Sequence, residues 1–500
     1  MASLDRILDI EALRRLESRA EEAGVDLMAR AACAAADWIT SRYPRPARLL
    51  IAAGVGNNGG DALMAALLLH ERGYRPDILV PATPASPATQ RALTALRAAG
   101  VEPVHGLGAA QYDLIVDGLF GIGLSRPPDA PWSELIAALN ASAAPILALD
   151  VPSGLDAWTG NAGGACIEAR YTLTFLCHKP GLFGASGADL AGEIELAALD
   201  CPPDWLEAGR GEVNRPDASP LRRRRDSHKG SNGSIGIVGG ACGMLGAALL
   251  AGRAALACGA GKVWIAALDP ALAVDTRAPE LMLLPRAHLP AADILAVGPG
   301  LGTSPQASAL LGEALADSRP LVLDADALNL VAADHALADA LSRRSGPSIL
   351  TPHPAEAARL LACPSSAVQA DRIAAATTLA ERFACIVVLK GAGSLIAAPD
   401  GRYRINPTGG PALAAAGQGD VLCGIAAALL AQGMDAWSAA CLSVFVHGLA
   451  GDDFQREQGG AIGLTASETA QRARHQLNRL VGQTLFDKLV GLTARTPQSP

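Results

Sequence analysis

LLIAAGVGNNGGDALMAALLL, residues 49–69, contains the pattern that decides the fold. A continuous apolar run comes first, four glycines (Gly54, Gly56, Gly59 and Gly60) follow, and apolar residues at helical spacing complete the stretch. An apolar run that leads through a glycine turn into a helix-length segment is typical of a buried parallel strand and the helix after it. The stretch therefore predicts a strand–turn–helix unit of an α/β domain.

The same rhythm recurs on both sides of the middle of the chain. Upstream, strands are predicted at 48–54, 76–81, 112–118 and 145–152, with helices at segments such as 62–73 and 133–142. Downstream, strands are predicted at 234–240, 262–268, 292–300, 320–328, 347–354 and 385–391, with helices at 245–258 and 366–383 and a hairpin around 399–401. Apolar strands separated by helices predict parallel sheets covered on both faces, so each half should be a three-layer α/β domain.

A polar segment, residues 207–233, separates the two halves. It contains prolines, glycines and the run Arg222–Arg225, but almost no apolar residues. Such a composition favours a solvated linker or entry loop over a nucleic-acid contact. We therefore expect an N-terminal domain over 1–212, a linker over 213–227 and a C-terminal domain over 228–490.

Composition excludes several classes of protein. Half of the 500 residues are hydrophobic, 18% are charged and the net charge is −8, which argues against wholesale disorder and against nucleic-acid binding. The ten cysteines include no CxxC pair, as expected for reduced thiols in the cytoplasm. No apolar stretch reaches about 18 residues and the N-terminus has no apolar signal core, so no membrane span is expected. The small apolar helices would allow a homo-oligomer.

Polar side chains follow the strands of the first half. Asn58 comes after the first strand, Asp117 ends another, and Asp150 and Ser153 follow the last. Ligands of parallel sheets bind beyond the carboxyl ends of the strands, so these side chains should lie together. Hard oxygen groups suit a weakly held cation or sugar hydroxyls better than zinc. Asp150 could act as a general base, although a strand-end aspartate is often only a turn former.

Four motifs give the first half a family resemblance: GVGNNGGD (54–61), VDGLFGIGLSRP (116–127), LDVPSGLDAWTG (149–160) and TLTFLCHKPGL (172–182). Together they resemble the epimerase module of NAD(P)H-hydrate repair proteins, with a Rossmann-like fold. The resemblance implies that Asn58, Asp117 and Ser153 hold K⁺, and that Asp150 contacts the substrate and acts as the base. It also implies that two loops bind the damaged nucleotide: Asn57, Asn58, Gly59, Gly60 and Asp61, and Gly121, Ile122, Gly123, Leu124, Ser125, Arg126 and Pro127.

In the second half, LAAAGQGDVLCG (413–424) places one acid, Asp420, at a glycine turn that opens a helix. The free N–H groups of Gly417 and Gly419 favour an anion, which a neighbouring carboxylate would repel unless a metal lies between them or the acid accepts a proton. As a helix-end acid Asp420 would contribute only about 0.3–1 kcal/mol. As a general base it could contribute about 10²–10⁴ in rate. The catalytic interpretation is therefore preferred over capping.

Other strand ends of this half carry further polar groups. Asp324 and Asp326 follow one strand, and Lys390 leads the flexible turn 390–394, a suitable polyphosphate contact. His353 lies between two prolines in an extended turn, where a ligand role and a structural role are equally open.

GQGD (417–420) resembles the GxGD motif of the ribokinase-like superfamily. In order, HKGSNG (228–233), AVGPGLG (296–302), LDADALN (323–329), ILTPHPAEAARLL (349–361) and VVLKGAGSLI (387–396) make this half similar to the ADP/ATP-dependent NAD(P)H-hydrate dehydratases. The resemblance implies Mg²⁺ with ADP or ATP, and Asp420 as acceptor of the C6 hydroxyl proton during transient phosphorylation. The implied nucleotide contacts are Lys390, Gly391, Ala392, Gly393, Ser394 and Gly419, and the implied contacts to the hydrated dinucleotide are Ala247, Gly302, His353 and Asp420.

Three functions follow as hypotheses. The first is a bifunctional repair enzyme that epimerises hydrated NAD(P)H at C6 and dehydrates its S form. The second is a ribokinase-type kinase of a sugar or vitamin precursor with an accessory nucleotide-binding domain. The third is a non-catalytic nucleotide sensor or scaffold, favoured only by two departures from the family pattern, Ala416 and Gln418. The ordered motifs of both halves favour the first.

Overall fold

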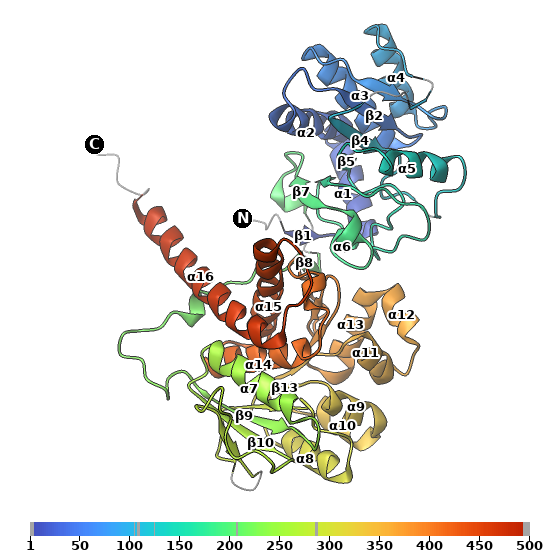
Figure 1. Ribbon diagram of the computed structural model, residues 1–500. Helices are drawn as coiled ribbons and strands as arrows, with labels where there is room; N and C mark the ends of the chain where they lie inside the picture. Colours follow the sequence, from blue (N-terminus) through green and yellow to red (C-terminus); the bar gives the residue numbers. More distant parts are fainter. Residues whose placement is uncertain are drawn as a thin grey trace. The chain divides into compact units, whose positions relative to one another are not determined.

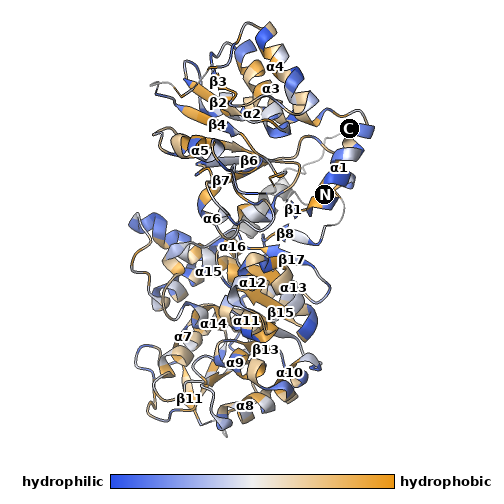
Figure 2. Cartoon of the chain, turned by 90° about the vertical axis from the view of Figure 1, so that its right-hand side faces the viewer, coloured by the Kyte–Doolittle hydropathy of each residue, from blue (hydrophilic) through white to orange (hydrophobic). Residues whose placement is uncertain are grey.

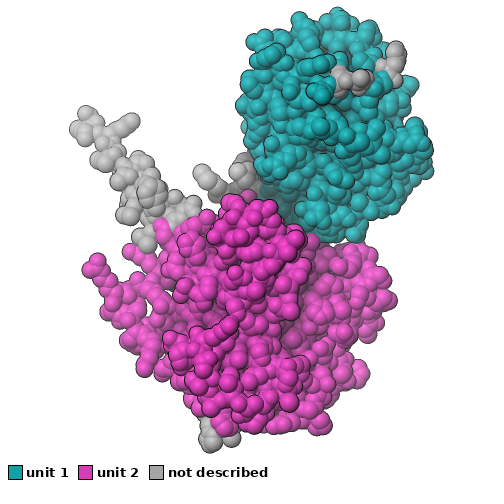
Figure 3. All heavy atoms as spheres, in the orientation of Figure 1, with its two compact units in different colours: residues 1–213 teal, residues 214–500 magenta. Residues whose placement is uncertain are grey.

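The computed structural model describes residues 5–104, 106–107, 111–124, 126–206, 209–285 and 289–493. Two compact units make up the chain, residues 1–213 (unit 1) and residues 214–500 (unit 2), coloured teal and magenta in Figure 3. Ser125, expected in the first site, lies outside the described residues.

Unit 1 is built on a parallel sheet with the strand order β3-β2-β4-β5-β6-β7 (Figure 1). Its strands are β2 (Leu49–Ala53), β3 (Asp77–Leu79), β4 (Leu114–Gly118), β5 (Ile146–Leu149), β6 (Tyr171–Phe175) and β7 (Glu193–Ala197). The predicted strands 48–54, 76–81, 112–118 and 145–152 all form, because their apolar side chains are buried on both faces.

Helices cover both faces of this sheet. They are α1 (Ile10–Glu22), α2 (Leu27–Arg42), α3 (Asn57–Glu71), α4 (Pro87–Ala98), α5 (Trp132–Asn140) and the short α6 (Gly187–Leu190). Leu49 and Ile51 pack in one cluster with side chains of α1, α2, α3 and α4, whereas Leu50 and Ala52 pack with α5 on the other face. This alternation along β2 produces the three layers.

The glycines of residues 49–69 serve a different purpose from a plain turn. α3 begins at Asn57, so Gly59 and Gly60 lie in its first turn rather than before it. A Cβ on Gly59 would lie 2.0 Å from the carbonyl oxygen of Gly54. The glycines thus let the start of α3 lie close to the end of β2. As a result, the observed helix begins at Asn57, earlier than the predicted helix 62–73.

Unit 2 contains a larger sheet with the order β17-β16-β15-β14-β13-β12-β9-β10-β11. The strands are β9 (Ser234–Gly239), β10 (Lys262–Ala267), β11 (Met282–Leu284), β12 (Ile294–Val297), β13 (Leu321–Leu323), β14 (Ser348–Leu350), β15 (Ile386–Leu389), β16 (Leu395–Ala397) and β17 (Tyr403–Ile405). Strands β9 to β15 are parallel, and β16 and β17 form the predicted hairpin around residues 399–401.

The helices of unit 2 are α7 (Leu245–Ala257), α8 (Pro305–Ala316), α9 (Asp326–Ala333), α10 (His335–Ser342), α11 (Pro354–Leu361), α12 (Ser365–Ala370), α13 (Arg372–Phe383), α14 (Gln418–Ala431), α15 (Ala436–Gln458) and α16 (Ala466–Thr493). Side chains of α7, α14, α15 and α16 share one large cluster with the sheet. Figure 2 shows the apolar character of strands such as β15 in orange. The α/β class expected for both halves is confirmed.

Two sequence-based expectations about elements were wrong in part. The predicted helix 366–383 is two helices, because the carboxylate of Asp371 caps α13 by accepting a hydrogen bond from the N–H of Ala374 (2.9 Å). The polar segment 207–233 is not wholly irregular, since β8 (Gly211–Val213) pairs antiparallel with β1 (Arg6–Ile7). Arg222–Arg225 are exposed, as expected for a solvated run. None of the helices in the described ranges is both long and apolar enough to span a membrane.

Candidate active sites

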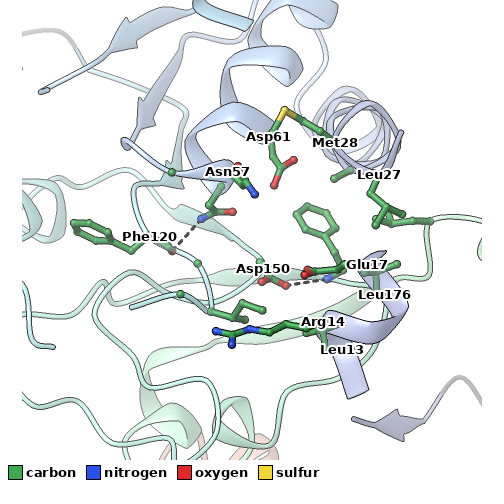
Figure 4. Close-up of a pocket in the computed structure, with 18 of the residues that line it drawn as sticks. Leu13, Arg14, Glu17, Leu27, Met28, Asn57, Asp61, Phe120, Asp150 and Leu176 are labelled. Atoms are coloured by element: carbon green, nitrogen blue, oxygen red, sulfur yellow. Dashed lines mark hydrogen bonds between the residues drawn. The ribbon is translucent and has the colours of Figure 1, made fainter. Parts of the chain in front are cut away.

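Unit 1 contains a cavity of about 1060 Å³ at the carboxyl ends of its strands (Figure 4). Side chains from α1, the start of α2, the start of α3, the loop after β4 and the ends of β5 and β6 line it. Predicted residues on its wall are Asn57, Asn58, Asp61, Gly121, Ile122, Gly123, Leu124, Arg126 and Asp150. The predicted Gly59, Gly60 and Pro127 are not among the described lining residues. Both glycines are buried, Gly59 against Gly54 and Gly60 against Met28 and Thr89.

Asp150 occupies a strained position directly after β5. Its φ is +66°, a left-handed conformation that residues other than glycine rarely adopt and that is often found at functional sites. Its Oδ1 accepts hydrogen bonds from Lys179 Nζ (2.5 Å) and from the backbone N–H of Phe175 (3.2 Å). Lys179 is buried and also donates to the carbonyl oxygen of Phe175 (2.6 Å). The carboxylate is therefore fixed through one oxygen.

Lys179 was missed by reasoning from the strand ends. The motif TLTFLCHKPGL, residues 172–182, includes it, but nothing local pairs it with an acid 29 residues upstream. β5 and β6 are neighbours in the sheet, and this pairing brings the two side chains together.

The three residues expected to hold a cation meet below the loop after β4. Ser153 Oγ donates to Asp117 Oδ1 (2.6 Å), and the N–H of Ser153 donates to Asp117 Oδ2 (2.9 Å). Asn58 Nδ2 donates to the carbonyl oxygens of Phe120 (2.9 Å) and Leu149 (3.1 Å). Burial raises the pKa of Asp117 to about 6, while the hydrogen bonds from Ser153 act in the opposite direction.

One atom of this group has no partner. Asn58 Oδ1 is buried and accepts no hydrogen bond within the described part of the chain. A buried unsatisfied oxygen costs about 1–3 kcal/mol, which a bound cation or water would offset. Across the described residues there is no cluster of three or more His, Cys, Asp or Glu that could hold a metal. The oxygens around Asn58 therefore fit a weakly held monovalent cation rather than a transition metal.

In unit 2, the N-terminus of α14 forms the second site. Gly417, with φ +82°, is the N-cap, and no side chain caps the helix there. The first N–H groups of α14 are consequently free of intrahelical partners. Asp420 lies in this first turn. Its pKa is raised to about 7, first by burial and then by the negative charge of Asp324, against the lowering effect of Lys390. A carboxyl group titrating near neutrality at an anion-binding helix end is suited to general-base work.

Lys390 lies at the centre of a carboxylate cluster. Its Nζ donates to Asp324 Oδ1 (2.8 Å) and lies 3.9 Å from Glu356 Oε2. Burial raises the pKa of Glu356 to about 6, against the lowering effect of Lys390. A Cβ on Gly419 would lie 3.4 Å from Lys390 Nζ, so the predicted nucleotide contacts Lys390 and Gly419 are brought together.

His353 has a structural role. Its Nδ1 accepts hydrogen bonds from the N–H groups of Ala355 (3.1 Å) and Glu356 (3.3 Å), and Glu356 Oε2 accepts one from the N–H of His353 (2.8 Å). These contacts form a capping box at the start of α11. Partial burial and the charge of Lys390 lower its pKa. The proline-flanked turn gave no signal for a cap, because histidine is an uncommon capping residue.

The remaining predicted residues lie in turns and at a helix start. Ser394 Oγ donates to the carbonyl oxygen of Gly391 (3.0 Å), which closes the turn containing Ala392 and Gly393. The N–H of Gly302 donates to Asp326 Oδ2 (2.8 Å). Ala247 lies in the first turn of α7.

Two family models match this chain in tandem. The model described as YjeF-related protein N-terminus matches residues 24–181, and the model described as NAD(P)H-hydrate dehydratase matches residues 235–473. The first match includes Asp150 and most residues that line its cavity, although not those of α1, and the second includes Asp420.

Similar proteins match nearly the whole chain. The bifunctional NAD(P)H-hydrate repair enzyme of Coxiella burnetii is 37% identical over 490 residues, which cover 93% of this chain and 98% of that protein. The enzyme of that name from Escherichia coli is 36% identical, and the aligned residues cover 93% of this chain and 90% of that protein. A solved ADP/ATP-dependent NAD(P)H-hydrate dehydratase from Bacillus subtilis, co-crystallized with ATP/Mg²⁺, is 30% identical with a TM-score of 0.47 and covers 53% of this chain and 99% of that chain. These matches cover nearly all of this chain and nearly all of each relative, which shows that the chain belongs to the family of bifunctional NAD(P)H-hydrate repair enzymes.

Proposed function

We propose that each unit carries one step of nicotinamide nucleotide repair. Unit 1 interconverts the R and S forms of NADH or NADPH hydrated at C6, and unit 2 removes water from the S form at the expense of ADP or ATP. The observation that carries the proposal is Asp420, a carboxyl group with a pKa of about 7 in the uncapped first turn of α14.

In unit 1, Asp150 is the proposed base. Its Oδ1 is held by Lys179 and Phe175, which fixes the direction of the carboxylate, while Asp150 also lines the cavity. A base fixed in this way can exchange a proton with the C6 hydroxyl of a bound substrate. Asn57, Asn58 and the loop 121–127 would contact the rest of the dinucleotide.

K⁺ is the proposed cation of unit 1. Asn58, Asp117 and Ser153 would hold it, in agreement with the unpartnered buried oxygen Asn58 Oδ1. When bound, it would supply a fixed positive charge near the nucleotide. The side chain of Asn58 would also position the loop after β4, through its hydrogen bond to Phe120.

In unit 2, the C6 hydroxyl oxygen attacks the terminal phosphorus of ATP or ADP, Asp420 takes the hydroxyl proton, and ADP or AMP leaves. The C6–O bond then breaks, inorganic phosphate leaves with the bonding electrons, and loss of a C5 proton restores the nicotinamide double bond. The free N–H groups at the start of α14 would stabilise the transferred phosphoryl group.

The nucleotide would bind at Lys390–Ser394 and Gly419. Asp324 and Glu356, whose carboxylates lie beside Lys390, fit a nucleotide-bound Mg²⁺, because Mg²⁺ prefers carboxylate and phosphate oxygens. Mg²⁺ would neutralise phosphate charge when bound. Lys390 would carry the positive charge that keeps the site from repelling the phosphates.

One assay tests both halves. The full chain is incubated with chemically hydrated NADH, Mg²⁺, K⁺ and either ADP or ATP, and the absorbance of restored NADH is followed. Interconversion of the separated epimers is measured by chromatography with the nucleotide left out. We expect nucleotide-dependent recovery of NADH and nucleotide-independent interconversion of the epimers.

The same preparation tests the kinase hypothesis. ATP-dependent phosphorylation of a hydroxymethylpyrimidine or a thiazole alcohol, with no recovery of NADH, would replace the proposal with a vitamin-precursor kinase. If the stably folded protein shows neither recovery of NADH nor phosphorylation of these alcohols, the non-catalytic hypothesis is favoured instead.

A further inference from the structure

The cavity of unit 1 contains a second carboxyl group, Asp61, near the start of α3. Figure 4 shows its side chain directed into the cavity that Asp150 also faces. Within the described part of the chain, the carboxyl group of Asp61 has no hydrogen bond and no ion pair. It is half-buried, so solvation does not fully replace the missing partners.

The surroundings of the two carboxyl groups are opposite. Asp150 Oδ1 accepts a hydrogen bond from the ammonium group of Lys179 (2.5 Å). Loss of hydration raises the pKa of Asp61 well above its usual value, and the negative charges of Asp150, Glu17 and Asp26 raise it further. Pairs of titratable groups whose environments separate them in this way mark the acid and the base of an active site.

We propose that Asp61 is the proton donor of the epimerisation, opposite the base Asp150. This inference rests on the proposed function of unit 1. The binding role expected for the 57–61 loop would need only a hydrogen-bonding side chain at position 61, whereas the inference requires one that carries a transferable proton.

The chemistry balances without any other reactant. Asp150 takes the proton of the C6 hydroxyl while Asp61 gives its proton to N1, the C6–N1 bond breaks, and the C6–O bond becomes a carbonyl. Rotation about C5–C6 turns the other face of the aldehyde toward N1. Ring closure then reverses both transfers: Asp150 returns its proton to the oxygen at C6, N1 returns its proton to Asp61, and the opposite epimer forms. Both carboxyl groups end in the protonation state in which they started.

Charged groups line the cavity around Asp61, and three of them, Asp150, Glu17 and Asp26, raise its pKa. Glu17 and Arg14 come from α1, Asp26 precedes α2, Arg91 lies on α4 and Arg126 lies in the loop after β4, while Asp150 and Lys179 follow β5 and β6. Glu17 is exposed and adds to the negative charge that Asp61 experiences. Its removal should therefore make Asp61 more acidic.

The test compares Asp61→Asn and Asp61→Glu with the unsubstituted full chain, in K⁺ and without ADP or ATP. The rate of interconversion of the purified NADH-hydrate epimers is measured against pH, with the uncatalysed rate subtracted. Because the acid must be protonated, the activity of the unsubstituted chain should fall as pH rises through the pKa of Asp61. Asp61→Asn should lower kcat about 10²–10⁴-fold and abolish this alkaline limb. Asp61→Glu should retain the limb.

Glu17→Gln provides a second measurement, which would stay unchanged if Asp61 only bound the substrate. It should shift the alkaline limb of the otherwise unsubstituted chain to lower pH, and it should have no such effect in the Asp61→Asn background. The inference is overturned if Asp61→Asn keeps kcat within threefold, if it changes KM alone, or if it retains the alkaline limb. An unsubstituted chain that does not interconvert the epimers would overturn the proposed function of unit 1 itself.

Discussion

At the residue scale, Asp420 allows the sharpest test of unit 2. Asp420→Asn keeps the shape of the side chain but cannot accept a proton. We expect the rate of NADH recovery from the S form to fall by at least about 10²-fold, the lower end of the usual contribution of a general base. Epimer interconversion in the same preparation should keep its rate. Loss of both activities in folded protein would contradict the assignment of separate sites.

The pH dependence of the dehydration follows from the same residue. Asp420 must be deprotonated to accept the hydroxyl proton, so activity should fall as pH drops through its pKa of about 7. Lys390 lowers that pKa, and Lys390→Met should therefore move the acidic limb to higher pH, in addition to weakening nucleotide binding. A kcat profile at saturating ADP or ATP checks this. An unmoved limb would mean that another group is titrating.

The sequence predicted Asp420 and Asp150 because each is an acid directly after a recognisable glycine turn or strand end. It did not predict the ion pairs of the two sites, Asp150 with Lys179 and Lys390 with Asp324. Lys179 and Asp324 lie far along the chain from the groups that they contact, and only the order of the strands in each sheet brings them close. For His353, the sequence left two roles open; the structure gives it a capping role, while its contact with substrate stays a prediction.

At the element scale, the start of α3 depends on a backbone approach that only glycine allows. Gly59→Ala would place a Cβ 2.0 Å from the carbonyl oxygen of Gly54, which must move away. Overpacking of this kind costs about 1–3 kcal/mol and exceeds the gain of about 0.5–1 kcal/mol that alanine brings to a helix. The free energy of unfolding, measured with denaturant for unit 1, should fall accordingly.

Gly56→Ala is the matched control for this prediction. A Cβ at Gly56 would meet no described atom within 4 Å, and its backbone is extended, with φ −95°. Gly56 is the N-cap of α3, where alanine is less favourable than glycine by up to about 1 kcal/mol, so the free energy of unfolding should fall by no more than that and by less than in Gly59→Ala. Equal losses for the two variants would contradict the packing argument.

Elements were predicted well where apolar runs decide them and less well where one polar side chain does. Each strand expected in unit 1 forms, because a run buried on both faces has few alternatives. By contrast, the apolar spacing of residues 366–383 predicts one continuous helix, which Asp371 divides into α12 and α13. The early start of α3 was also missed, because glycine is a poor helix former in isolation and only packing against β2 favours it there.

At the scale of the whole molecule, the two units should act in sequence on one substrate pool. Starting from the pure R form, NADH recovery requires both activities; starting from the S form, it requires unit 2 alone. Asp150→Asn should therefore slow recovery from the R form, toward the uncatalysed rate of epimerisation, and leave recovery from the S form unchanged. Separate time courses from the two purified epimers check this. Equal slowing from both forms would contradict a role confined to unit 1.

Asp150 offers only one of its oxygens to the cavity. Oδ1 is engaged by Lys179 and Phe175, while Oδ2 has no described partner and lies 3.8 Å from the point that a Cβ on Gly121 would occupy. Any side chain at position 121 would thus crowd the approach to the one oxygen that is free to react. Because Gly121 has no side chain, the approach to Oδ2 from this side stays open. As the proposed base, Asp150 would therefore exchange protons from a single direction, and epimerisation would require the substrate rather than Asp150 to move.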